Sequence, residues 1–174
     1  MAGPYALGID YGGTKILGAV VDVSTGKVLG TIPAPGNGGD SGLAWAEGTL
    51  WVGQHRDRRI HQVDPETGAV LRTIESDRFV TGVTWVDGEL WHGTWQDEAS
   101  DVRRIDPETG EVLERLEMPS GTGVSGLESD RGDRFFCGGG DSGKVRAVRR
   151  PRASTSGSIE ESGSYVRDPI KQLT

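Results

Sequence analysis

Two histidines stand at related places in the chain, and imidazole is the side chain best suited to proton transfer near neutral pH. His55 and His92 each come at or just after the end of a short apolar phrase that contains Leu-Trp. With Asp97 or Glu98 nearby, the two rings could hold a divalent metal ion or act as general bases. The structural alternative is that His92 replaces a strand valine and His55 is a solvated loop residue.

A lone aromatic side chain, that of Trp95, follows His92 closely in the sequence. Trp95 has no tryptophan counterpart in the related segments, and a single ring in a pocket-facing loop is suited to stacking on a ligand. Gln54 and Thr94 follow equivalent strands and are expected to line the same mouth. We therefore expect Trp95, His55, His92, Thr94 and Gln54 to surround a small molecule or peptide in an axial pocket. No cofactor is expected, unless His55 and His92 bind a metal ion.

Two further motifs resemble known binding motifs but are better explained as turns. The run Gly138-Gly-Gly-Asp-Ser-Gly143-Lys144 imitates a nucleotide-binding phosphate loop, but Val145 follows where such a loop needs Ser or Thr to hold magnesium. The tripeptide Arg131-Gly132-Asp133 falls on a predicted hairpin turn. Neither motif predicts a nucleotide or integrin site.

These residues belong to a repeat. The phrases Asp22-Val-Ser-Thr-Gly26, Asp64-Pro-Glu-Thr-Gly68 and Asp106-Pro-Glu-Thr-Gly110 stand about 42 residues apart, and a strand-like phrase follows each of them. Hairpin signals such as Asp87-Gly88 lie between them. A period of about 40 to 45 residues is typical of a four-stranded propeller blade. We predict an all-β protein, a β-propeller segment of about four hairpin-led blades.

The repeat also predicts the boundaries. We place the propeller in residues 1–150, with units at about 5–33, 40–75, 80–118 and 123–150, and a disordered polar tail in residues 151–174. The first unit is too short between Gly18 and Asp22 for all four strands, and the last has no Thr-Gly turn. Either two chains pair these open ends as a homodimer, or the chain is a shortened propeller that self-associates poorly.

Composition excludes several classes of protein. The net charge of −7 disfavours a nucleic-acid partner or an anionic membrane surface, and no run of residues is long and apolar enough to span a membrane. The single Cys137 excludes a disulfide framework, and the first residues lack the pattern of a signal peptide. A cytoplasmic location is expected.

One family resemblance runs through residues 41–149. The phrases Phe79-Val-Thr-Gly82-Val-Thr-Trp85 and Gly88-Glu-Leu-Trp91-His92 look like those of glutamine cyclotransferase propellers, and are similar to virginiamycin B lyase-like propellers. The resemblance implies conversion of N-terminal glutamine to pyroglutamate in a central pocket. The family pattern has a Glu where this chain has His92, and another at 123–125. We therefore expect a binding or scaffold protein; the alternative is a glutaminyl-peptide cyclotransferase or a metal-assisted lyase.

A second resemblance covers about the first thirty residues. The run Leu7-Gly-Ile-Asp10-Tyr-Gly12-Gly13-Thr14-Lys15 resembles the phosphate-binding hairpin of sugar kinases of the ROK family (repressor, open reading frame, kinase). It implies that Asp10 lies near metal-bound ATP and that the residues 12–14 approach the phosphates. A fragment of such a kinase is the third alternative, and the same residues also align with the first propeller hairpin.

Overall fold

The computed structural model describes residues 5–12, 15–22, 24–35, 38–139 and 143–151. Every regular element among them is a β-strand, and none of them forms a helix long and apolar enough to cross a membrane. The tail predicted for 151–174 lies, beyond Pro151, outside the described residues.

The strands form four antiparallel sheets, and in each sheet they lie in their order along the chain. The strands are β1 (Tyr5–Gly12), β2 (Lys15–Asp22), β3 (Lys27–Pro33), β4 (Asp40–Ala46), β5 (Thr49–Gln54), β6 (Arg59–Val63), β7 (Val70–Glu75), β8 (Phe79–Val86), β9 (Glu89–Gln96), β10 (Ala99–Ile105), β11 (Val112–Glu117), β12 (Gly126–Ser129), β13 (Arg134–Gly138) and β14 (Val145–Arg149). The first sheet is β1–β3, the second β4–β7, the third β8–β11 and the fourth β12–β14.

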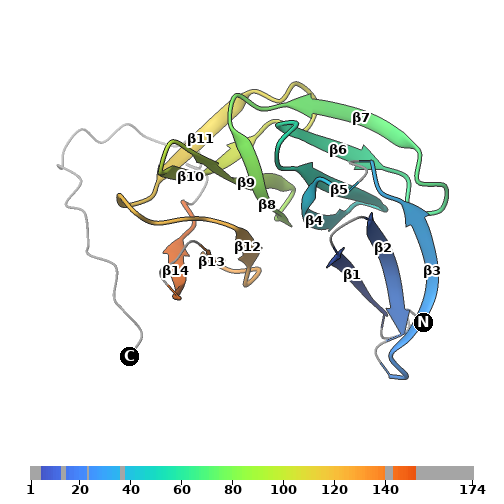
Figure 1. The fold of residues 1–174 in the computed structure, drawn as a ribbon. Coiled ribbons are helices and arrows are strands. Elements are labelled where there is room, and N and C mark those ends of the chain that lie inside the picture. Colours follow the sequence, from blue (N-terminus) through green and yellow to red (C-terminus); the bar gives the residue numbers. More distant parts are fainter. Residues whose placement is uncertain (1–4, 13–14, 23, 36–37, 140–142, 152–174) are drawn as a thin grey trace.

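The sheets are arranged as neighbouring blades (Figure 1). Strand β8 packs against β4 on one side and β12 on the other, so these three are the inner strands, while β7 and β11 are outer strands. The second and third sheets have four strands, and the first and fourth have three. The predicted all-β propeller segment of about four blades, incomplete at both ends, is confirmed.

The first sheet departs from the prediction in one respect. The turn at 22–26 joins β2 to β3, as the turn at 64–68 joins β6 to the outer strand β7. Strands β2 and β3 therefore take the places of the third and outer strands. The hairpin expected in the first residues is present as β1 and β2, but it does not hold the inner position, because β2 pairs with the outer strand β3.

The Asp-to-Gly turns at 64–68 and 106–110 are held by bonds from the aspartate side chain to the backbone. Asp64 Oδ1 accepts hydrogen bonds from the backbone N–H groups of Glu66 at 2.8 Å and Thr67 at 2.9 Å, and Gly68 has a φ of 74°. The corresponding bonds recur in the turn at 106–110. These bonds lower the pKa of Asp64, because they favour its charged form. Local hydrogen bonding thus fixes where the outer strands β7 and β11 begin.

The hairpins between inner and second strands close as predicted. Asp87 and Gly88 both have positive φ, 52° and 78°, and Glu47 and Gly48 repeat this at 49° and 80°. Two successive residues of positive φ are typical of the type I′ turn, whose twist matches that of the strands it joins.

Apolar side chains fill the spaces between consecutive sheets. Between the second and third sheets, Trp51 stacks on Trp85 with ring centroids 6.3 Å apart. Between the third and fourth, Trp91 packs on Phe135 at 4.9 Å. Rings of this size bury large apolar areas, so they are a principal source of cohesion between blades.

Trp45 is an exception to the expected pattern. It repeats the position of Trp85, which packs between blades, but it is 54% exposed. Trp85 stacks on Trp51 of the preceding sheet, whereas no ring among the described residues stacks on Trp45. An equivalent place in the repeat therefore does not by itself bury the ring.

Candidate functional site

A cavity of about 220 Å³ lies between the second and third sheets, on the side of their outer strands. One wall is apolar and is formed by Ile60, Ile74, Ile105 and Val112. The polar part of the lining comes from Glu75, Ser76, Asp77, His92 and Arg103. The cavity therefore combines aliphatic side chains with a comparable number of polar ones, two of them carboxylates.

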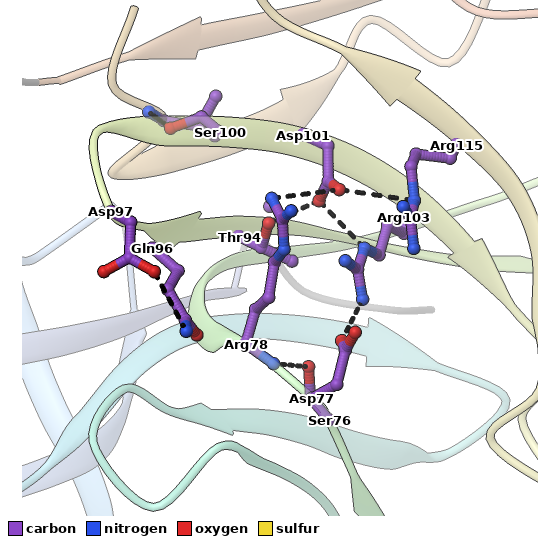
Figure 2. Close-up of polar contacts among 12 residues, drawn as sticks. Ser76, Asp77, Arg78, Thr94, Gln96, Asp97, Ser100, Asp101, Arg103 and Arg115 are labelled. Atoms are coloured by element: carbon purple, nitrogen blue, oxygen red, sulfur yellow. Dashed lines mark hydrogen bonds and ion pairs between the residues drawn. The ribbon is translucent and has the colours of Figure 1, made fainter.

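Arg103 dominates the polar part of the lining. Its side chain is 1% exposed, and strand β10 directs it inward. Its Nε donates to Asp101 Oδ1 at 2.8 Å and its Nη1 to Asp77 Oδ1, as Figure 2 shows. Its Nη2 is buried and has no hydrogen-bond partner among the described residues. Burial opposes the charged form, yet the bonds to Asp101 and Asp77 raise the pKa of Arg103. A charged guanidinium with one unused donor results.

Asp101 holds this guanidinium in place. It is 1% exposed, and its Oδ1 also accepts a hydrogen bond from the Thr94 hydroxyl. Its Oδ2 forms ion pairs at 3.4 Å with Arg78 and with Arg115, without hydrogen-bond geometry (Figure 2). With Arg103, three guanidinium groups therefore surround one buried carboxylate.

The cluster as a whole is positive. Arg78, Arg103 and Arg115 contribute three positive charges, and Asp77 and Asp101 contribute two negative ones. A hydrogen bond from Arg103 lowers the pKa of Asp77, so this carboxylate is charged at neutral pH. One positive charge is left over beside the cavity.

His92 lines the same cavity from strand β9. It is 1% exposed, it is the strand partner of Arg103, and its Nδ1 lies 3.2 Å from the carbonyl oxygen of Gly93. Burial lowers the pKa of His92 to about 4, and the nearby charge of Arg103 acts in the same direction. The ring is therefore neutral at pH 7.

The other predicted site residues are distributed along the inter-blade spaces. Thr94 joins the Arg103 cluster through Asp101. Gln54 is buried in the second sheet, where its Oε1 lies 2.9 Å from His61 Nε2, and His61 Nδ1 lies 2.8 Å from the Thr73 hydroxyl. Gln54 and Thr94 stand at equivalent repeat positions, so the second and third sheets both carry a polar side chain there.

His55 and Trp95 lie elsewhere. The His55 ring stacks on Phe79 at 5.0 Å, and its Nδ1 is 3.2 Å from the Val80 carbonyl oxygen. Trp95 belongs to strand β9 rather than to a loop, pairs with Phe79 and is 47% exposed. Of the five predicted residues, only His92 and Thr94 belong to the Arg103 cavity and its cluster.

His55 and His92, the proposed metal pair, make separate contacts in the structure. In the part of the chain that it describes, no group of three or more His, Cys, Asp or Glu side chains is placed to hold a metal ion. His55 and His92 have different partners. Metal binding at these residues remains a prediction.

The sequence analysis missed the charged cluster. Asp101, Arg103 and Ile105 alternate on one strand and so share one face, which the structure shows to be buried. The available sign of this buried face was the alternation of two charged residues and an isoleucine along the strand. Charged residues on a strand usually indicate a solvated face, so the pattern alone does not predict burial.

Comparisons with known proteins agree with the repeat architecture. Residues 18–146 match the model of a family described as a repeat of unknown function (DUF6923). The protein belongs to this family. No curated protein matches the chain.

Two solved structures show the same fold. A protein of unknown function from Bacteroides caccae has a TM-score of 0.58 and 15% identity, with 84% of this chain and 54% of that chain covered. BamB from Moraxella catarrhalis has a TM-score of 0.50 and 15% identity, with 79% and 38% covered. The DUF6923 chain thus spans about half or less of the length of these propeller-like proteins.

Proposed function

We propose that the chain is a non-catalytic binding module, a propeller segment of the glutamine cyclotransferase-like group that has a binding cavity without the catalytic carboxylates. The observation that carries the proposal is Arg103, a residue of the cavity lining whose buried Nη2 has no hydrogen-bond partner among the described residues. A buried donor without an acceptor is unfavourable by about 1 to 3 kcal/mol, and a bound oxygen atom would remove that penalty.

The state of the ionisable groups favours binding over catalysis. A general acid or base works best when its pKa is near the working pH. His92 has a pKa of about 4 and is enclosed between two sheets. Asp101 is surrounded by Thr94 and three guanidinium groups. These groups hold Arg103 in position and are poorly placed to exchange protons with a substrate.

The lining indicates the kind of ligand. Arg103 offers a hydrogen-bond donor and positive charge, and Ile60, Ile74, Ile105 and Val112 supply an aliphatic part of the lining. Glu75, also at the cavity, is paired with Arg59 at 2.9 Å, which reduces its repulsion of an anion. A cavity of about 220 Å³ is smaller than the roughly 300 to 1,000 Å³ of drug-sized sites. A short branched carboxylic acid, such as isovalerate, matches these features.

Titration calorimetry with isovalerate tests the proposal, and isoamylamine, which has the same carbon skeleton and the opposite charge, serves as the ligand control. We expect the acid to bind and the amine not to bind. Arg103→Lys keeps the charge but removes the Nη2 donor, and should weaken binding roughly tenfold or more. Val112→Trp should fill the cavity and abolish binding without touching the charged cluster.

Arg59→Lys is the matched arginine control, because Arg59 is exposed and pairs with Glu75 rather than with the Arg103 cluster. It should bind isovalerate as the original protein does. Failure of the acid to bind, or equal binding by the Arg103→Lys variant, would contradict the proposal.

A further inference from the structure

Two polar residues of the cavity lining are enclosed far more completely than its two carboxylates. His92 and Arg103 are each 1% exposed, whereas the side chains of Asp77 and Glu75 are 68% and 67% exposed. Each carboxylate also has an arginine partner, since Asp77 pairs with Arg103 and Glu75 pairs with Arg59. Hydrogen bonds are strongest where water is excluded, so His92 and Arg103 are the lining residues best suited to select a ligand.

The surroundings of His92 decide which of its ring nitrogens carries the proton. Nδ1 lies 3.2 Å from the carbonyl oxygen of Gly93, which can only accept a hydrogen bond, so Nδ1 is the donor. Burial lowers the pKa of His92 to about 4, so at neutral pH the ring holds this one proton. Nε2 is therefore an acceptor, and it forms no hydrogen bond with a described residue. A buried acceptor without a donor is unfavourable.

Arg103 carries the complementary group. Arg103 on β10 and His92 on β9 are direct strand partners, so their side chains leave the same face of the third sheet. Nη2 of Arg103 is a buried donor without a hydrogen-bond partner in the described part of the chain. One unused donor and one unused acceptor thus belong to neighbouring residues of the same cavity lining.

We infer that the ligand is a short branched 2-hydroxy acid, an inference that rests on the proposed binding of a carboxylic acid in this cavity. The carboxylate accepts a hydrogen bond from Arg103, and the 2-hydroxyl group donates one to Nε2 of His92. Cross-strand partners have Cβ atoms only about 4.5 to 5.5 Å apart, so the two ligand groups belong on adjacent carbon atoms. The compound 2-hydroxyisovalerate meets this requirement and differs from isovalerate by one hydroxyl group.

The charge of the cluster distinguishes this class from two others that also carry a donor. A 2-amino acid brings an ammonium group, which would add positive charge beside a cluster that already has one positive charge in excess. A carboxamide can donate to His92, but it has no negative charge to match that excess. The hydroxy acid supplies both a negative charge and a neutral donor.

Titration calorimetry of the full chain at neutral pH tests the inference with three ligands of the same carbon skeleton: 2-hydroxyisovalerate, isovalerate and valine. We expect the hydroxy acid to bind roughly tenfold more tightly than isovalerate, because its hydroxyl group satisfies the buried acceptor. Valine should bind more weakly than the hydroxy acid, because its ammonium group lies beside Arg103.

Two substitutions at His92 remove the acceptor in different ways. His92→Val introduces the residue that the second sheet has at the corresponding place, Val52, and His92→Phe keeps a ring of similar size. In both variants the ratio of the two dissociation constants should fall from roughly ten to about one. A ratio is used because a change in cavity size affects both acids alike.

His55→Val is the matched histidine control, because the His55 ring stacks on Phe79 and is not part of the cavity lining. This variant should keep the preference for the hydroxy acid. Equal binding of the two acids, a preference that survives both His92 substitutions, or tighter binding of valine would overturn the inference and leave the proposed function standing. Binding of neither acid would overturn the proposed function and this inference together.

Discussion

His92 brings a titratable ring to a place that neighbouring sheets fill differently. Val52 holds the corresponding place in the second sheet, because it pairs with His61 as His92 pairs with Arg103. Cys137 holds it in the fourth sheet. Valine at this site in a sister repeat shows that the fold does not need an ionisable group there. The histidine should therefore make the folded state sensitive to acid.

We predict that stability falls as the pH falls from about 6.5 to about 4. In that range the unfolded chain binds a proton at His92 that the folded chain, with a pKa of about 4, does not bind. Linkage then gives a loss of about 2 to 3 kcal/mol by pH 4.5. Urea unfolding at pH 7.5 and 4.5 should show this loss in the original protein and much less of it in His92→Val.

Two aspartates also make stability depend on pH, but in a more acidic range. Hydrogen bonds lower the folded-state pKa of Asp64 and Asp106 below the ordinary value of 3.8. Their contribution is present above that value and is lost only as the pH falls further. An equal loss between pH 7.5 and 4.5 in both proteins would therefore assign the acid sensitivity to groups other than His92.

Among the elements, the Asp-to-Gly turns have two roles. Each starts an outer strand, and each also packs on the preceding sheet. A Cβ on Gly68 would lie 2.9 Å from Pro33 Cδ of β3, and one on Gly110 would lie 2.7 Å from Ile74 Cγ2 of β7. Arg72 adds a 2.7 Å hydrogen bond to the carbonyl oxygen of Pro107. The turn thereby connects consecutive blades at their outer edge.

Gly110→Ala and Gly88→Ala separate these roles. Both glycines have a φ near 77°, at 76° and 78°, so each substitution should cost about 1 to 2 kcal/mol of backbone strain. A Cβ at residue 88 would meet nothing within 4 Å, whereas one at residue 110 would clash with Ile74. Overpacking should therefore cost about 1 to 3 kcal/mol more in Gly110→Ala. Equal free energies of unfolding for the two variants would contradict a packing role for the turn.

The sequence predicted these turns well because their chemistry is local. The Asp side chain, the proline and the glycine are all within five residues, so their spacing alone indicates the fold. The position of β2 was harder to predict. A weak Gly-rich hairpin at 8–17 resembles an inner pair, and only the pairing of β2 with the outer strand β3 shows that β2 is the third strand of its sheet.

The site was predicted less well than the turns, because it depends on how the neighbouring sheet packs over the strand. Thr94 and His92 were identified from their place in the repeat, but Asp101 and Arg103 were not. Their burial arises from the second sheet packing over them. For Trp95 the sequence suggested a pocket-facing loop, because no other repeat has a tryptophan there. In the structure its ring is half exposed on strand β9. The axial pocket remains a prediction.

At the scale of the whole molecule, the packing between sheets joins consecutive members of the chain. The third sheet has the second on one side and the fourth on the other, and both interfaces contain a buried tryptophan. The fourth sheet has a described neighbour on one side only. Stability in such an array is approximately a sum of the stabilities of the units and the couplings between neighbours.

That unequal coverage has a consequence for how the protein opens. Amide hydrogens in β8 and β9 should exchange with deuterium most slowly, while those in β13 and β14 should exchange by local fraying at a lower free energy. Mass spectrometry of exchange over time would reveal this gradient, and uniform protection across the sheets would contradict it. Unfolding would then proceed inward from a terminal blade, so a single melting midpoint would describe an average over several openings rather than one cooperative event.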